Sequence, residues 1–155
     1  MSIEIKIIDI RCYDALVDFL FEFDINNRDR NYWLNRIHYW WDINPSFYPE
    51  IIRGWVLLDG KRIVGVIGHI PLDFQFSGRF IKVYAATTWY VKKKYRNNSL
   101  LLYGKSLSQT RKTISFNTTA SSDVAKIMKL LKFKSLIAGD KIKYSFVVIR
   151  TYNYL

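Results

Sequence analysis

The sequence predicts an α/β (α+β) domain with a mixed, mainly antiparallel sheet of about seven strands and helices on both faces. Three apolar runs within 54–91, separated by tight-turn signals, predict an antiparallel meander. Helix, strand, helix and two strands are predicted after it, which gives the sheet helices to pack against. The chain has 155 residues, half of them apolar, so we expect a single domain over 1–155 with a sizeable core.

The N-terminal part is predicted to contain a strand and two helices. Isoleucines alternate with charged residues over 2–10, which is the period-two pattern of a strand with one buried face. Over Tyr13–Phe23, apolar residues recur at helical spacing and acidic residues lie between them, which predicts an amphipathic helix. The polar run 26–30 then predicts a loop before the second helix.

The segment 32–45 is rich in aromatic residues. Trp33, Ile37, Trp40 and Trp41 fall on one face at helical spacing, and two interpretations remain open. The first is a helix packed on the core. The second is a substrate groove lined by Trp40 and Trp41, because aromatic surfaces with a polar rim often bind ligands.

The meander follows. Gly54–Leu58 and Ile63–Ile70 flank the turn Asp59-Gly60 and predict a β-hairpin. A second turn, Ser77-Gly78, leads to a long strand over Arg79–Val91. We therefore expect three antiparallel strands in sequence order.

The remaining elements alternate between helix and strand. The patterns predict a helix over Ser99–Arg111, a strand over Thr113–Thr118 and a helix capped by Ser121-Ser122-Asp123. They then predict two last strands, over Phe133–Ile137 and Ile142–Tyr152.

The junction between the long strand and the following helix predicts an anion site. The strand ends at Val91, a basic turn covers 92–96, and a helix begins at Ser99. The first turn of a helix has unpaired N–H groups and a partial positive charge, so phosphate is the expected ligand.

The segment Val91-Lys92-Lys93-Lys94-Tyr95-Arg96 and the loop after it resemble the acyl-CoA-binding motif of the GNAT (N-acetyltransferase) superfamily. Trp41-Asp42-Ile43-Asn44-Pro45 resembles a second element of that family, and the hairpin Leu57–Gly65 a third. The predicted order of strands and helices is also similar over nearly the whole chain. The resemblance implies the acyl-CoA N-acyltransferase fold.

The same resemblance implies a function and a site. It implies transfer of an acetyl or similar acyl group from acetyl-CoA, or another acyl-CoA, to a primary amine of a small acceptor, without a metal. In this family, backbone amides at the end of the strand and in the loop hold the thioester and the pyrophosphate of coenzyme A. The cofactor-binding residues implied here are Trp89, Tyr90, Val91, Arg96, Asn97, Asn98, Ser99, Leu100 and Asn117.

The residue that takes a proton from the amine is not fixed by the sequence. His69, Asp73, Tyr84 and Glu50 are the titratable groups near the expected cleft. We assign His69 and Tyr84 as catalytic candidates and Asp73 as substrate-binding, and His69 suits neutral pH best. The alternatives are a core role for His69 and proton transfer to water.

Three residues depart from the family pattern. Ser99 and Leu101 stand where the family has small loop residues, and Met128 stands where it usually has a tyrosine. Successive helical residues lie about 100° apart, so three leucines at 100–102 cannot all be buried. We expect Leu101 to face the sheet and Leu100 to face outward. The departures keep open a catalytically inactive binding module whose basic face holds nucleic acid or acidic lipid.

Charge and composition limit the other classes. The net charge is +11, and residues 1–52 carry 5 Lys/Arg and 9 Asp/Glu, so the remaining 19 Lys/Arg and 4 Asp/Glu lie after them. A basic half attracts polyanions in general, but no nucleic-acid motif is present, and we expect no nucleic acid. The apolar runs fall short of the roughly 18 residues of a membrane span, and the N-terminus lacks a signal-peptide layout. With one cysteine and two histidines, we expect a cytoplasmic protein without a metal. A homodimer is left open.

Overall fold

The computed structural model describes residues 3–110, 113–118 and 120–135. The chain divides into two compact units, Met1–Thr119 and Ala120–Leu155, and each is described by itself. Whether the two units make up the predicted single domain stays a prediction.

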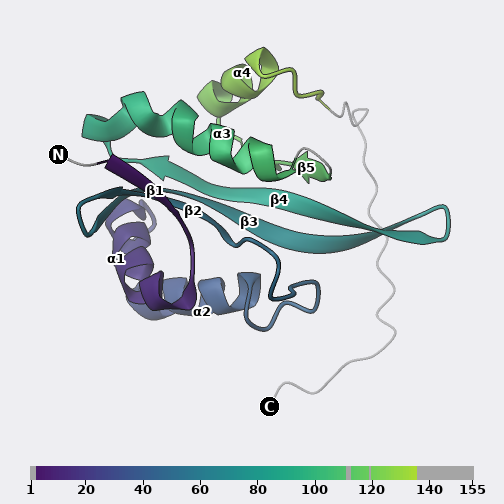
Figure 1. The fold of residues 1–155 in the computed structure, drawn as a ribbon. Helices are drawn as coiled ribbons and strands as arrows, with labels where there is room; N and C mark the ends of the chain where they lie inside the picture. Colours follow the sequence, from purple (N-terminus) through teal and green to yellow (C-terminus); the bar gives the residue numbers. More distant parts are fainter. Residues whose placement is uncertain (1–2, 111–112, 119, 136–155) are drawn as a thin grey trace. The chain divides into compact units, whose positions relative to one another are not determined.

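The first unit is built on a five-stranded sheet with the strand order β1-β2-β3-β4-β5 (Figure 1). All neighbouring strands are antiparallel except β4 and β5, which are parallel, so the sheet is mixed and mainly antiparallel as predicted. The strands are β1 (Ile3–Ile7), β2 (Gly54–Asp59), β3 (Arg62–Phe76), β4 (Arg79–Val91) and β5 (Ile114–Phe116).

Helices cover both faces of this sheet. Figure 1 shows α1 and α2 against one face and α3 against the other, which confirms the predicted arrangement. The first unit contains η1 (Ile10–Cys12), α1 (Tyr13–Phe23), α2 (Arg30–Trp40), η2 (Lys93–Asn98) and α3 (Ser99–Thr110). The second unit contains α4 (Ser122–Leu130), whose first turn is capped by the Ser121 hydroxyl, which accepts from the Val124 N–H.

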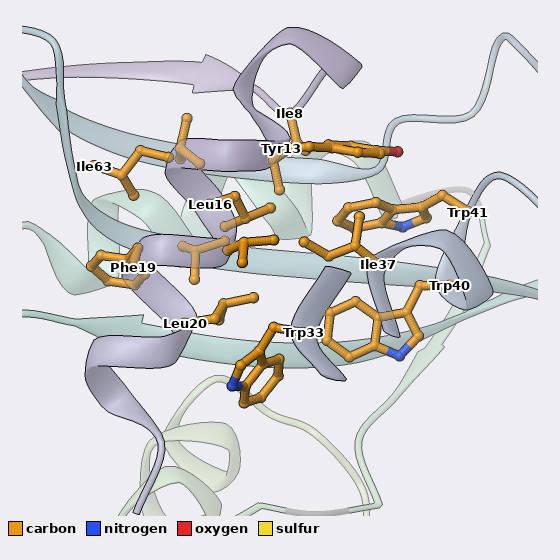
Figure 2. Close-up of a cluster of buried hydrophobic side chains, with 13 residues drawn as sticks. Ile8, Tyr13, Leu16, Phe19, Leu20, Trp33, Ile37, Trp40, Trp41 and Ile63 are labelled. Carbon is orange, nitrogen blue, oxygen red and sulfur yellow. The ribbon is translucent and has the colours of Figure 1, made fainter. Parts of the chain in front are cut away.

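The core on the α1 and α2 side is aromatic and aliphatic (Figure 2). Leu16 and Leu20 of α1 meet Ile37 of α2, and all three are almost completely buried. The indole of Trp41 lies beside the Tyr13 ring, with 5.8 Å between the ring centroids. The helical spacing of these residues in the sequence is therefore the spacing of a buried face.

The chain reverses between α1 and α2 around one carboxylate. Asp24 accepts from Arg28 Nε at 2.7 Å, from Trp33 Nε1 at 3.1 Å and from the Asn26 N–H at 2.8 Å. The hydrogen bonds from Arg28 hold the pKa of the Asp24 carboxyl well below its usual range. The loop predicted from the polar run 26–30 is thus fixed by a network of ionic hydrogen bonds.

Strand β3 is longer than predicted: the prediction ended it at Ile70, and the strand continues through Pro71. The Pro71 carbonyl accepts from Asn44 Nδ2 at 3.1 Å, so the backbone groups of Pro71 point away from β4. A proline is tolerated at such a position because no ladder hydrogen bond needs its N–H. Strand β3 continues to Phe76, with Asp73 and Lys82 paired across the hairpin at 2.6 Å.

The two last predicted strands are not found in the part of the chain that is described. Residues 133–135 are not in a strand, and 136–137 and 142–152 lie outside the described residues. The described sheet therefore has five strands where about seven were predicted.

Candidate acyl-CoA site at the end of strand β4

A β-bulge interrupts β4 shortly before its end. Val66 of β3 pairs with Tyr90, and Gly68 pairs with Thr87, so two residues of β4, Thr88 and Trp89, lie opposite one residue of β3. Thr88 has φ of 48°, a left-handed conformation that is strained for a β-branched residue. Bulges of this kind are common beside active sites, where they redirect the strand.

The pairing of β4 with β5 ends before the bulge. Strand β5 pairs only with Val83–Ala85, and among the described residues no strand pairs with this edge of β4 over 86–91. The backbone N–H and C=O groups on this edge are therefore available to a ligand that carries amide groups of its own.

The side chains at the end of β4 are used for packing. Trp89 lies against Tyr103 of α3, with ring centroids 4.4 Å apart. Tyr90 stacks on Phe23 of α1 at 5.6 Å and 16° between the ring planes. Because consecutive side chains point to opposite faces, both rings anchor the strand and its backbone is left for binding.

The strand leads into the 3-10 helix η2 and then directly into α3 at Ser99. The Tyr95 N–H donates to the Lys92 carbonyl at 2.8 Å and closes the first turn. The Tyr95 hydroxyl donates to Asp59 Oδ2 at 2.7 Å, which joins this loop to the end of β2. The predicted arrangement of strand, basic turn and helix N-terminus is present.

The cations of the turn differ in what they contact. Lys92 Nζ pairs with both oxygens of Glu22, at 2.7 and 2.5 Å, so its charge is already used. Lys93, Lys94 and Arg96 are exposed, and no carboxylate of the described residues lies within ion-pair distance of them. Three positive charges therefore remain for an anion near the start of α3.

One of the three leucines at 100–102 of α3 does not lie as predicted. Leu102 is fully buried, but Leu100 and Leu101 are both exposed, at 59% and 57%. The expectation that Leu101 faces the sheet is wrong. The buried face of α3 consists of Leu102, Tyr103, Ser106 and Thr110, and a helix with this phase leaves the two preceding leucines in solvent.

His69 is completely buried. Its Nε2 lies 2.6 Å from Ser106 Oγ of α3, and its ring packs against Trp55 and Tyr84. Its Nδ1 has no hydrogen-bond partner among the described residues. Burial lowers the pKa of His69 to about 4. It is therefore neutral at pH 7 and has no surface through which an acceptor amine could reach it. Tyr84, the second catalytic candidate, is 8% exposed and lies in the same packed cluster.

The three predicted substrate-binding residues are held by contacts within the protein. Trp41 is buried and donates from Nε1 to the His69 carbonyl at 2.8 Å. Trp40 is buried at the same helix end and borders a shallow hollow with Tyr32, Asn35, Arg36 and Tyr39. Asp73 is exposed and ion-paired with Lys82. The packing interpretation of the aromatic segment accounts for both tryptophans.

The other predicted residues have simple positions. Asn97 is exposed, and Asn98 is half-buried with its amide 3.5 Å from the Tyr95 carbonyl. Asn117 follows the end of β5 and is half-buried, whereas Met128 belongs to α4 of the second unit. Within the described residues, no three metal-binding side chains gather, and no helix is long and apolar enough to cross a membrane.

Comparison with known proteins gives a fold but not a close relative. No protein-family model matches the sequence, and no curated protein sequence matches it. Solved structures do match. A Trypanosoma brucei acetyltransferase is 14% identical with a TM-score of 0.64, covering 94% of this chain and 100% of that one. A predicted acetyltransferase with acetyl-CoA from Clostridium acetobutylicum is 14% identical with a TM-score of 0.66, covering 92% and 96%. Glucosamine-6-phosphate N-acetyltransferase from Arabidopsis thaliana is 8% identical with a TM-score of 0.63, covering 96% and 99%.

Proposed function

This chain has the acyl-CoA N-acyltransferase (GNAT) fold, and from that premise we propose that it transfers an acetyl or similar acyl group from a coenzyme A thioester to a primary amine of a small acceptor. One observation carries the proposal. The bulged end of β4, with one edge unpaired among the described residues, leads directly into the N-terminus of α3, and the three exposed cations of this turn pair with no described carboxylate.

The binding roles follow from these groups. Backbone N–H and C=O groups on the open edge of β4, over 86–91, would pair with the amide groups of the pantetheine arm. The N-terminal N–H groups of α3 and the guanidinium of Arg96 would hold the pyrophosphate. The exposed ammonium groups of Lys93 and Lys94 would add attraction at longer range.

The reaction needs position more than it needs a reactive side chain. The amine nitrogen forms a bond to the thioester carbon, the carbon–sulfur bond breaks, and the thiolate leaves with the electron pair. A backbone N–H of β4 that donates to the thioester oxygen would stabilise the charge that develops there. The amine proton would pass to water, because His69 and Tyr84 are buried and Asp73 is paired with Lys82. Glu50, the fourth titratable group predicted near the cleft, is exposed in the segment before β2.

A second function is favoured by one residue. Leu101 lies exposed in the first turn of α3, where this fold family usually has a small residue beside the pyrophosphate. If the leucine side chain fills that space, the chain is a non-catalytic member that holds an anion on its basic turn. Comparing coenzyme A affinity in the wild type and in Leu101→Gly separates the two functions.

Calorimetric titration of coenzyme A into the protein tests the site. We expect Arg96→Ala to weaken binding about five- to tenfold at low salt, because a charge-assisted contact is lost. The difference should shrink as salt rises. Arg79→Ala, at the exposed tip of the β3–β4 hairpin, is the matched control and should bind like the wild type.

An activity assay completes the test. Release of free thiol from acetyl-CoA, measured with a panel of small primary amines, should exceed the rate without an amine. A wild type that does not bind coenzyme A, together with a Leu101→Gly variant that does, would refute the enzyme and support the binding module.

A further inference from the structure

The loop between β4 and α3 has one side-chain hydrogen bond to the rest of the sheet. Among the six residues of η2, all of them described, Tyr95 alone places its side chain on a strand, where its hydroxyl donates to Asp59 Oδ2 at 2.7 Å. The two residues are 36 positions apart in the sequence. The other side-chain hydrogen bond, from Asn98 Nδ2 to the Tyr95 carbonyl, is long at 3.5 Å and stays inside the loop.

Asp59 offers a fixed point for this bond. It is the last residue of β2, paired with Ile3 of β1 on one side and with Arg62 of β3 on the other. The tight turn at Gly60, which has φ of 62°, begins directly after it. A carboxylate on a backbone held from both sides can position a neighbouring loop with little freedom of its own.

The bond leaves the neighbouring cation unused. The Tyr95 hydroxyl donates to the Asp59 carboxylate, while Arg96, the next residue, is exposed, and no carboxylate among the described residues lies within ion-pair distance of it. The loop is thus joined to an acidic residue without using the charge that would meet the ligand.

We propose that Asp59 is a positioning residue for the anion-binding loop, acting through Tyr95. The bond sets the conformation of η2, and through it the direction of the Arg96 side chain and of the first N–H groups of α3. This inference rests on the proposed coenzyme A site, and it assigns the affinity of that site partly to a residue that does not touch the ligand.

The test compares four variants by calorimetric titration with coenzyme A at low salt. Tyr95→Phe removes the hydroxyl and keeps the ring, and should weaken binding about five- to tenfold. Asp59→Asn keeps an oxygen that can accept and removes the charge, so it should bind within about twofold of the wild type. Asp59→Ala should weaken binding as Tyr95→Phe does, and the double variant Asp59→Ala/Tyr95→Phe should be no weaker than either single variant.

Two controls exclude general effects. Tyr39→Phe makes the same chemical change at an exposed tyrosine of α2 and should leave affinity unchanged. Glu22→Gln removes the exposed carboxylate that pairs with Lys92 at the other end of the turn, so it frees a further ammonium group and should not weaken binding. Backbone hydrogen exchange over 93–98 in the ligand-free protein should accelerate in Tyr95→Phe and stay unchanged in Asp59→Asn.

The outcomes separate this inference from the proposed function. Wild-type binding with an unchanged affinity in Tyr95→Phe would overturn the positioning role and leave the coenzyme A site intact, even if the variant melts earlier. Additive losses in the double variant would also overturn it. A wild type that does not bind coenzyme A would overturn the proposed function, and the positioning role with it.

Discussion

Buried His69 makes the free energy of unfolding of this protein depend on pH between about 4 and 6.5. Burial lowers the pKa of His69 from an ordinary 6.5 to about 4. Between these values the unfolded chain binds a proton that the folded chain does not, so the free energy of unfolding must fall as the pH decreases. For these two pKa values, lowering the pH from 7.5 to 5.0 costs about 2 kcal/mol, and below pH 4 the contribution of this residue becomes constant.

Urea unfolding at pH 7.5 and at pH 5.0 measures this loss directly. The sequence has only one other histidine, His38, whose Nδ1 lies 2.6 Å from Asp42 in a partly exposed pair. His69→Gln should abolish most of the loss between the two pH values, whatever it does to stability at pH 7.5, whereas His38→Gln should retain it. If the wild type and His69→Gln lose the same free energy between pH 7.5 and 5.0, the buried ring is not the cause and the argument fails.

Three further substitutions test the backbone and the core, each by urea unfolding. Gly54→Ala should cost more than about 3 kcal/mol, because its Cβ would lie 2.1 Å from the Ile67 carbonyl oxygen and the residue has φ of 136°. Gly60→Ala has open space around it and should cost about 1 kcal/mol. Equal losses in the two variants would contradict the clash at Gly54. Thr88→Gly should raise stability by about 1 kcal/mol by relieving the left-handed conformation at the bulge, and a loss would show that the threonine is not strained. Trp41→Phe should cost about 1–3 kcal/mol, since it leaves a buried carbonyl of β3 without its donor; a neutral result would mean that water replaces the indole.

The sequence predicted best where one local pattern decides the structure. Helix α1 runs over the predicted Tyr13–Phe23 because its apolar stripe is unambiguous, and the end of β4 at Val91 is marked by the basic turn. The faces of the leucines in α3 were not predictable in the same way. With three apolar residues in a row, any of several faces of the helix could be the buried one. The buried face includes Ser106 and Thr110, two polar residues that a hydrophobicity pattern places in solvent.

The contacts that complete the candidate site were also missed, for a related reason. Asp59 has a sufficient local explanation as the first residue of an Asp-Gly turn, so nothing in the sequence indicates its bond to Tyr95. Lys92 belongs to a run of three lysines, and only the structure shows that its ammonium group is paired with the Glu22 carboxylate. The ordinary pKa of a histidine makes His69 suitable as a base at neutral pH, but burial lowers that pKa to about 4, and the sequence does not show this burial.

The bulge at Thr88 interrupts the regular alternation of side chains between the two faces of β4. If all residues of β4 paired with β3 in one continuous register, alternation from Thr87 would turn Trp89 toward α1 and Tyr90 toward α3, and both rings would meet the wrong helix. The residues after Thr87 would also pair one position further along β3, which would move the basic turn by about 3.3 Å. The bulge therefore determines which helix holds each ring and where the cations of the turn stand. A deletion of Thr88 would leave Tyr90 opposite Val66 and place Trp89 opposite Ile67, so it would remove the bulge and keep both rings on their present faces.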